Sequence, residues 1–413
     1  MSEPRGARET TIELGTVCAE RNGERSRLSV LVRAGDVAEP WWFDIPADLH
    51  AQATATASPW LVAVLPLAAA LGATVTAAAP VDARLVEQLQ RILQIWRAWY
   101  AWVRPVRFDC PTASPAPLAG PRRAAAFFSG GVDSLFTAIR PRDSTVLGER
   151  AHIDELISVH GFDIPLGNVA AFQRLRERHA AFARDRGCSF VHVTTNLRET
   201  RLREVSWGWV SHGCAMAAAA LVLEPRYHTV LIPATGGYRD LHPWASHPLT
   251  DPLFSTSATA FVHDGAGSTR LDKLRLLTQC VHALDVLRVC WESRTDENCG
   301  HCNKCLRTLA LLECLGALGR ASTFPERQLD TAALAHVHCA ESWDYREFRD
   351  LRALARSVGR PDIARAAAAA MRRSRRAHAW QRARDRLAGA VRSALPRRLT
   401  RDRPPTAERP PAS

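Results

Sequence analysis

Apolar runs and helix-compatible segments alternate through the middle of the chain. Short apolar runs bounded by turn residues predict five strands, and the longer segments between them have apolar positions at helical spacing. The strands are expected at Ala124 to Phe128, Leu156 to His160, Phe190 to Thr194, Val230 to Pro233 and Val286 to Trp291, and the helices at Asp133 to Arg140, Val169 to Arg186, Ser206 to Leu223 and Arg270 to Leu284. This alternation is typical of an α/β fold with a doubly wound parallel sheet, whose ligands bind beyond the carboxyl ends of the strands.

Residues 1–110 are predicted to form a small, separate α/β domain. Its expected elements are strands at Leu28 to Val32 and Trp41 to Ile45, and helices at Leu61 to Leu71 and Ala83 to Tyr100. The uncharged, Pro-rich segment 111–121 is typical of a stiff linker and sets the predicted boundary. The sheet is then expected within 122–320, followed by a helical region rich in Arg and Ala at 321–394 and a disordered basic tail at 395–413.

One apolar run, Trp60 to Pro80, approaches the length of a membrane span. Pro66 and Gly72 interrupt it, and Thr74-Val75-Thr76 has the residue types of a strand. We therefore expect a buried helix followed by a strand, and no membrane role.

The hexapeptide Ser129-Gly130-Gly131-Val132-Asp133-Ser134 lies between the first predicted strand and helix of the central sheet. Such a turn directs backbone N–H groups and the positive end of a helix dipole at one point, which suits a phosphate. The two serine hydroxyls can donate further hydrogen bonds, and Asp133 can orient the loop or hold Mg²⁺. No lysine follows the glycines, so the loop is not of the GxxxxGK[ST] type. The alternative interpretation is an ordinary Gly-Gly turn.

The hexapeptide resembles the SGGxDS loop of the PP-loop ATP pyrophosphatases. The resemblance implies a Rossmann-like core that binds ATP and Mg²⁺. It also implies a reaction in which the loop holds the β- and γ-phosphates while an acceptor attacks the α-phosphorus, giving an adenylated intermediate and pyrophosphate. The nucleotide-binding role then falls on Ser129, Gly130, Gly131, Val132, Asp133 and Ser134, with Asp133 and Ser134 as catalytic candidates.

The same resemblance points to two further places. His160, Gly161 and Phe162 follow the second strand, where the family binds adenosine. Lys273 stands where many members have a phosphate-contacting lysine, which makes it the third catalytic candidate. Lys273 and Lys304 are the two lysines among 54 basic residues, which favours a role that a guanidinium does not fill. The alternatives are a satisfied loop histidine and a solvated helix lysine. The long segment 236–257, rich in His and Asp, is expected to contact the acceptor.

Cys290, Cys299, Cys302 and Cys305 have the close spacing of ligands in a four-thiolate Zn²⁺ site. Four sulfur ligands leave no open position on the metal, so such a site is structural. An iron–sulfur cluster uses the same ligands and is the main alternative, ahead of a redox dithiol. His301 lies between two better ligands and is expected to be a spectator.

The cysteine spacing, downstream of the SGGxDS loop, resembles that of the 7-cyano-7-deazaguanine synthases over about half of the chain, from Ala124 to Leu315. The resemblance implies adenylation of a carboxylate, amide formation with ammonia, and dehydration of the amide to a nitrile. The second-strand loop departs from this family, since His160-Gly161-Phe162-Asp163 replaces its Tyr-Gly-Gln-Arg run. The N-terminal domain and the Arg-rich C-terminal region lie outside the resemblance.

The charge of the chain is concentrated at its C-terminus. Residues 371–413 hold 13 arginines against three carboxylates, a net charge of +10 out of +12 for the whole chain. The body is therefore nearly neutral, and RNA contact is expected only through the basic tail. Eleven mostly scattered cysteines and the absence of a basic-then-apolar start predict a cytoplasmic protein.

Three functions are consistent with these patterns. The first is an ATP-dependent ligase that activates a small-molecule carboxylate for amide or nitrile formation. Its expected partner is an ammonia donor, and its expected oligomeric state is a homodimer. The second is a PP-loop enzyme that modifies tRNA or another nucleic acid. The third is an ATP-binding module without catalysis.

Overall fold

The computed structural model describes residues 10–113, 121–141, 153–326 and 328–394. These residues form two compact units. The first runs to Thr269 and includes Arg294–Asp296, and the second comprises Arg270–Ser293 and the chain from Glu297 onward. The disordered tail predicted at 395–413 lies outside the described residues.

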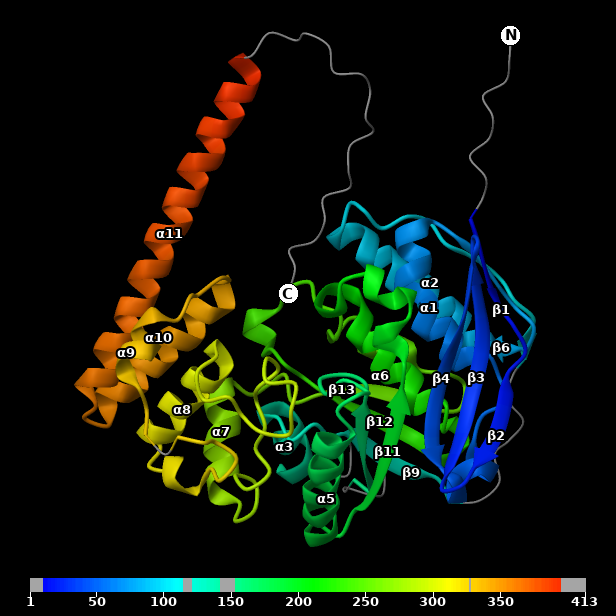
Figure 1. Ribbon diagram of the computed structural model, residues 1–413, viewed down its shortest axis with the longest axis horizontal. Helices are drawn as coiled ribbons and strands as arrows, with labels where there is room; N and C mark the ends of the chain where they lie inside the picture. The colour runs from blue at the N-terminus through cyan, green and yellow to red at the C-terminus, as the bar shows by residue number, and fades with distance from the viewer. Residues whose placement is uncertain (1–9, 114–120, 142–152, 327, 395–413) are drawn as a thin grey trace. The chain divides into compact units, whose positions relative to one another are not determined.

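A parallel five-stranded core lies in the first unit (Figure 1). Its sheet order is β13-β12-β9-β10-β11, and every neighbouring pair in it is parallel. The strands are β9 (Arg123–Phe127), β10 (Glu155–His160), β11 (Ser189–Thr195), β12 (Tyr227–Pro233) and β13 (Ala260–Asp264). Along the chain, β10 and β11 follow on one side of β9, and β12 and β13 then follow on its other side. The strand order of the sheet therefore reverses at β9. This confirms the α/β class with a mostly parallel central sheet.

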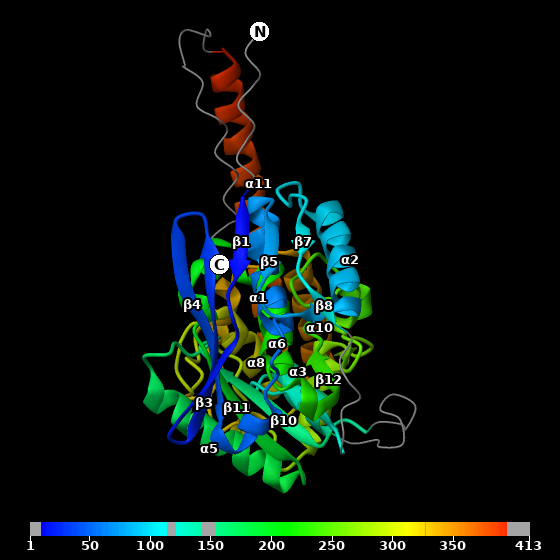
Figure 2. The ribbon, with the colours of Figure 1, turned by 90° about the vertical axis from the view of Figure 1, so that its right-hand side faces the viewer.

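The N-terminal strands continue the same sheet (Figure 2). β4 pairs antiparallel with β11 at two positions, Thr194 with Asp44 and Thr195 with Phe43. Beyond it the order is β3, β1, β5 and β7, with β2 paired to β3, while β6 and β8 form a separate pair. The bounds are β1 (Thr11–Leu14), β2 (Cys18–Asn22), β3 (Arg25–Ala34), β4 (Val37–Pro46), β5 (Thr74–Ala77), β6 (Val81–Asp82), β7 (Arg107–Asp109) and β8 (Thr112–Ala113). The sequence predicts a separate domain for residues 1–110, whereas the structure gives them a shared sheet.

Helices cover both faces of the sheet in the first unit. α1 (Ser58–Leu71) packs on α6 (His212–Leu221), and one hydrophobic core joins them to alternate residues of the strands. α3 (Val132–Ile139) packs on β9 and β12, and α5 (Val169–Asp185) packs on β10 and β11. α2 is Ala83–Trp99. The apolar run from Trp60 is thus a buried helix followed by β5, as predicted, and no described helix has the length and apolarity to span a bilayer.

The second unit is helical. Its helices are α7 (Arg270–Gln279), α8 (Asn303–Cys314), α9 (Thr331–His336), α10 (Ser342–Ser357) and α11 (Pro361–Ala394). Short helical turns across both units are η1 (Ala47–Gln52), η2 (Leu197–Glu199), η3 (Arg201–Glu204), η4 (Trp207–Ser211), η5 (Glu224–Arg226), η6 (Tyr238–Asp240), η7 (Asp251–Phe254) and η8 (Leu318–Arg320). α11 packs on α9 and α10 and then extends beyond them.

Two predicted elements differ in the structure. The fifth strand is β13, not Val286 to Trp291, which forms irregular backbone. The helix predicted from Arg270 to Leu284 ends at Gln279. The second unit begins at Arg270, so the four cysteines belong with the helical region rather than with the sheet to which the sequence assigns them.

Candidate functional site

The Ser129–Ser134 loop joins β9 to α3 through a tight turn. Gly130 has φ +73°, a conformation that favours glycine, and Gly131 is the extended N-cap residue of α3. The Ser134 hydroxyl accepts a hydrogen bond from the Ser129 backbone N–H at 3.2 Å and donates to the Gly131 carbonyl at 3.0 Å. The Ser129 hydroxyl accepts from the Gly131 backbone N–H at 3.3 Å. Both serines therefore shape the turn, and Asp133 lies in the first turn of α3.

The loop follows the strand at which the sheet order reverses. β9 lies between β10 and β12, so the residues after these three parallel strands leave the sheet at the same edge. They are Ser129–Gly131, Gly161–Phe162 and the segment from Ala234 to Gly237. In open α/β sheets this edge, at the reversal, is where ligands bind.

His160 and Gly161 are held tightly by their surroundings. The His160 ring stacks on Phe172 with centroids 4.2 Å apart, and its Nε2 lies 3.1 Å from the Pro165 carbonyl oxygen. Burial lowers the pKa of His160, so the neutral ring donates to that carbonyl. Gly161 has φ +99°, and a Cβ there would lie 2.0 Å from the Thr195 carbonyl oxygen. Contact of these residues with a nucleotide stays a prediction.

Aromatic side chains extend from Phe162 across this edge. The ring of Phe162 contacts Trp207 at a centroid distance of 5.0 Å. Trp207 begins the π-helical turn η4, and Trp244, from the predicted acceptor segment, contacts both Trp209 and His212. These rings are half-buried. The sequence shows the individual tryptophans but not the π-helical turn that brings them together.

Asp251 anchors the acceptor segment to β13. The buried carboxylate accepts hydrogen bonds from His263 Nδ1 and the Ser246 hydroxyl, both at 2.7 Å, and from the His247 backbone N–H at 3.1 Å. Burial lowers the pKa of His247 to about 4, so its ring is neutral near pH 7. The network fixes one end of the long segment rather than leaving it as a free lid.

The four predicted cysteine ligands meet in the second unit. Their Sγ atoms all lie within 4.8 Å of one another, with Cys290 and Cys302 3.9 Å apart and Cys299 and Cys305 3.8 Å apart. A disulfide would bring two sulfurs to about 2 Å, so these are separate thiols. The group could hold a metal ion such as zinc.

The backbone at the start of α8 favours a thiolate at Cys302, whereas the pKa values of Cys299 and Cys305 are raised by burial and by hydrogen bonds among the four thiols. The Cys305 backbone N–H donates to Cys302 Sγ at 3.5 Å, which makes Cys302 the N-cap of α8. Hydrogen bonds from the Cys305 thiol and backbone outweigh burial and lower the pKa of Cys302 to about 5. A deprotonated sulfur at a helix N-terminus is the form that a metal binds.

The predicted lysine and the Ser129–Ser134 loop belong to different units. Lys273 is buried in the first turn of α7, in the second unit, whereas the Ser129–Ser134 loop belongs to the first. Its phosphate role stays a prediction. Lys304 lies over the Trp291 ring at 5.8 Å.

Comparisons with known proteins add no relative, because no family model, curated protein or solved structure matches the chain.

Proposed function

We propose that this protein is an ATP-dependent adenylating enzyme of the PP-loop type that activates a small-molecule carboxylate. The observation that carries the proposal is the Ser129–Ser134 turn, with Gly130 at φ +73°, at the strand where the sheet order reverses. A Gly-Gly turn of no function could occur at any strand end. In this turn the Ser134 hydroxyl makes two hydrogen bonds to the backbone, and α3 begins directly after it. The turn also lies at the edge of the sheet where ligands bind in open α/β folds.

The loop suits the departure of pyrophosphate. Backbone N–H groups at the start of α3 and the helix dipole would stabilise the charge that develops on the leaving group. Asp133 would hold Mg²⁺, which offsets the same charge. An adenylated carboxylate is already activated, so ammonia can form the amide mainly through positioning.

The acceptor is proposed to lie along the aromatic edge beyond Phe162. Trp207 and Trp244 offer half-buried ring faces on the side of the sheet where the loop also lies. Such faces suit a carboxylate with a flat apolar body. A carboxylate that carries such a body is therefore our first choice of substrate.

We infer that the four cysteines bind a single structural zinc ion. Zn–S bonds of about 2.3 Å in a tetrahedron give S···S edges of roughly 3.8 Å. The observed pairs, at 3.9 Å and 3.8 Å, are close to that edge. An iron–sulfur cluster distributes its cysteines over several iron atoms and separates them further, so the spacing favours one ion.

The decisive experiment is ATP–pyrophosphate exchange by full-length, zinc-replete protein with Mg²⁺ and a panel of carboxylates that includes 7-carboxy-7-deazaguanine. We expect exchange that depends on one acid and is lost in Asp133→Ala. Asp36→Ala removes an exposed carboxylate from the β3–β4 turn and serves as the control. Exchange that persists in folded Asp133→Ala would refute the assignment of the loop.

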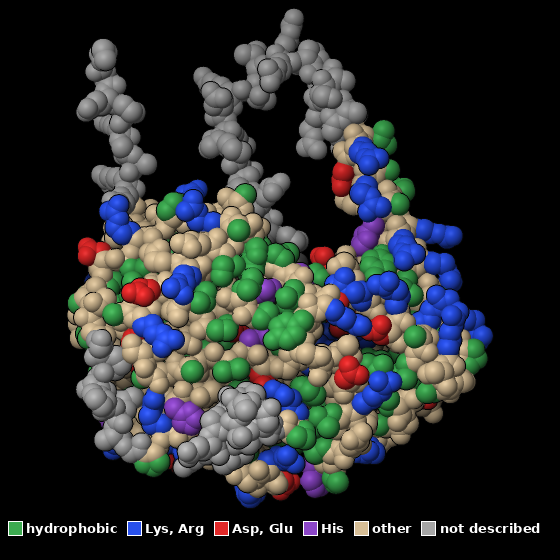
Figure 3. All heavy atoms as spheres, turned by 180° about the vertical axis from the view of Figure 1, so that it is seen from behind, with side chains coloured by type: hydrophobic (Ala, Val, Ile, Leu, Met, Phe, Trp, Pro, Cys, Tyr) green, Lys and Arg blue, Asp and Glu red, His purple; other side chains and the backbone are tan. Residues whose placement is uncertain are grey.

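A nucleic-acid substrate is the second candidate, and the surface of α11 favours it. Arginines 372, 373, 375, 376, 382, 384 and 386 are all exposed on this helix. Figure 3 shows Lys and Arg side chains gathered along it. Removal of residues 380–413 keeps Ser374, whose hydroxyl accepts the Cys339 backbone N–H. Lost turnover on tRNA with unchanged turnover on a small acid would assign RNA contact to the removed segment, which includes Arg382, Arg384 and Arg386.

A further inference from the structure

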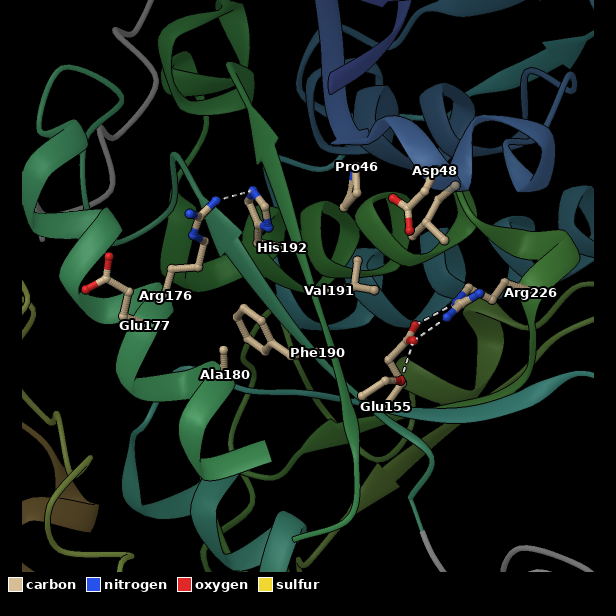
Figure 4. Close-up of a pocket in the computed structure, with 12 residues that line it drawn as sticks. Pro46, Asp48, Glu155, Arg176, Glu177, Ala180, Phe190, Val191, His192 and Arg226 are labelled. Carbon is tan, nitrogen blue, oxygen red and sulfur yellow. Dashed lines mark hydrogen bonds and ion pairs between the residues drawn. The ribbon is translucent and has the colours of Figure 1, made fainter. Parts of the chain in front are cut away.

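A pocket of about 510 Å³ lies at the amino-terminal ends of β10 and β11, in the first unit (Figure 4). It forms because β4 pairs with β11 only at Thr194 and Thr195, so the two strands part before the start of β11. The residues that line it are Pro46, Asp48, Leu49, Glu155, Arg176, Glu177, Ala180, Ser189, Phe190, Val191, His192 and Arg226. The nucleotide loop follows the opposite, carboxyl ends of these parallel strands, so this pocket is a different place.

Two guanidinium groups converge on one imidazole at this pocket. His192 Nε2 lies 2.5 Å from Arg25 Nη1 and 3.4 Å from Arg176 Nη1. Burial, followed by the two nearby arginines, lowers the pKa of His192 to about 3, so the ring is neutral. A neutral imidazole nitrogen has one lone pair, and it satisfies one donor fully. Among the described residues, Arg176 therefore keeps N–H donors that His192 does not satisfy.

The carboxylates near these arginines are engaged elsewhere. Glu155 is fully buried and accepts from Arg226 at 2.8 Å and 2.6 Å. Glu177 accepts from Gln173 on its own helix, and Figure 4 shows its carboxylate directed away from the Arg176 guanidinium.

The acceptors that Arg25 finds among the described residues are uncharged. It donates to the Asp44 carbonyl oxygen and the Thr194 hydroxyl, while the Asp44 carboxylate binds Arg27 through two hydrogen bonds of 2.8 Å. Asp48 is exposed on the β4 side of the pocket. Within the described part of the chain, neither Arg25 nor Arg176 forms an ion pair with a carboxylate.

The rest of the wall is largely apolar. Phe190 and Val191 come from β11, Pro46 and Leu49 from the end of β4 and the turn after it, and Ala180 from α5. Ala180 lies one helical turn after Arg176, and its short side chain leaves room beside the guanidinium. The pocket thus has a cationic end and an apolar body.

We propose that this pocket binds a small molecule whose phosphate or carboxylate group is held by Arg176 beside His192, with an apolar body along Phe190 and Val191. A planar guanidinium fork matches both kinds of anion, and an anion satisfies the donors that His192 cannot. Because the site lies at the opposite end of the strands from the nucleotide loop, its ligand is an effector rather than the acceptor. The inference does not depend on the adenylation proposal.

The test is isothermal titration calorimetry of the full chain with phenyl phosphate and with benzoate. We expect one molecule of at least one probe to bind per chain, and Arg176→Ala to weaken that binding by roughly tenfold or more, as expected for loss of a charged hydrogen bond. The control is Arg184→Ala, an exposed arginine on the same helix, which should bind like the wild type. Tighter phenyl phosphate identifies a phosphate ligand, and tighter benzoate a carboxylate.

Asp133→Ala separates this pocket from the nucleotide loop and should leave probe binding unchanged. Three results would overturn the proposal: no binding of either probe to folded wild type, equal binding by Arg176→Ala, or loss of binding in Asp133→Ala together with displacement by ATP. Each variant is compared by circular dichroism, so that loss of folding is recognised.

Discussion

The side-chain oxygen of Asn298 accepts a hydrogen bond from the backbone N–H of Cys290 at 3.0 Å. It also accepts from the Val289 N–H at 2.8 Å, and its amide nitrogen donates to the Leu287 carbonyl at 2.9 Å. Asn298 is buried and directly precedes Cys299. One side chain therefore holds the first cysteine, which lies eight residues earlier in the chain, against the other three.

Asn298→Ala should consequently destabilise the cysteine site. The change leaves the backbone N–H groups of Val289 and Cys290 without their acceptor, at a cost of about 2–3 kcal/mol, while the Leu287 carbonyl keeps its hydrogen bond from Thr323. We expect lower zinc content, and weaker zinc retention in competition with a chelator. Gln381→Ala removes an exposed amide of α11 and is the control. Normal zinc retention by Asn298→Ala would show that the cysteines assemble without this side chain.

Cys302→Ser distinguishes metal binding from helix capping. Cys302 is the N-cap of α8, and serine is a favoured N-cap residue, so the variant keeps the cap while losing a thiolate. We expect loss of zinc, measured by elemental analysis, and a lower melting temperature than that of the loaded wild type. With zinc stripped by a chelator, the two proteins should melt alike. A stoichiometric zinc content in Cys302→Ser would contradict the four-thiolate site.

The same asparagine explains a failure of prediction. Val286 to Trp291 is apolar enough for a strand, but the backbone donors of Val289 and Cys290 bind the Asn298 side chain instead of a neighbouring strand. β13, with the sequence Ala-Phe-Val-His-Asp, has polar residues whose partners, such as Asp251 and Thr137, are distant in sequence. Periodicity contains no information on such tertiary partners.

The elements that the sequence predicts well are those with strong local signals. β9 is a continuous apolar run, β10 and β12 contain shorter ones, and β11 alternates buried with half-buried residues, all of which are strand patterns. The cysteine spacing predicts the metal group directly. The link between the N-terminal strands and the central sheet rests on two residue pairs, Thr194 with Asp44 and Thr195 with Phe43. Nothing in either segment alone indicates that pairing, so a separate domain is the natural prediction.

Gly161→Ala tests the packing of the loop after β10, which leaves the sheet at the same edge as the Ser129–Ser134 loop. Gly161 has φ +99°, and a Cβ would lie 2.0 Å from the Thr195 carbonyl oxygen, which belongs to the backbone of the neighbouring strand. We expect a loss of about 3 kcal/mol or more in unfolding free energy, or a displaced loop after β10, with weaker ATP binding. Gly167→Ala, where no atom lies within 4 Å of the added Cβ, is the matched control. Equal stability of the two variants in urea would contradict the close approach of Gly161 to the Thr195 carbonyl.

Glu155 gives a pH-dependent prediction. Burial alone would raise the pKa of Glu155, but hydrogen bonds from Arg226, Tyr227 and Ser189 outweigh it, so the pKa in the folded protein is lowered. The carboxylate therefore contributes stability above its unfolded pKa, and this contribution is lost as the pH falls through the folded pKa. Glu155→Gln removes the charge and leaves Arg226 without its carboxylate, although Arg226 keeps its hydrogen bond to Gln52, at a cost of about 2–4 kcal/mol at pH 7.

The measurement is urea unfolding of wild type and Glu155→Gln from pH 7 down to about pH 3. The difference in unfolding free energy should be largest at neutral pH and should shrink below about pH 4.5, where the unfolded carboxyl begins to hold its proton. Glu87→Gln, at an exposed position of α2, should show no such dependence. A difference that stays constant over this range would mean that the loss comes from packing rather than from the charge of Glu155.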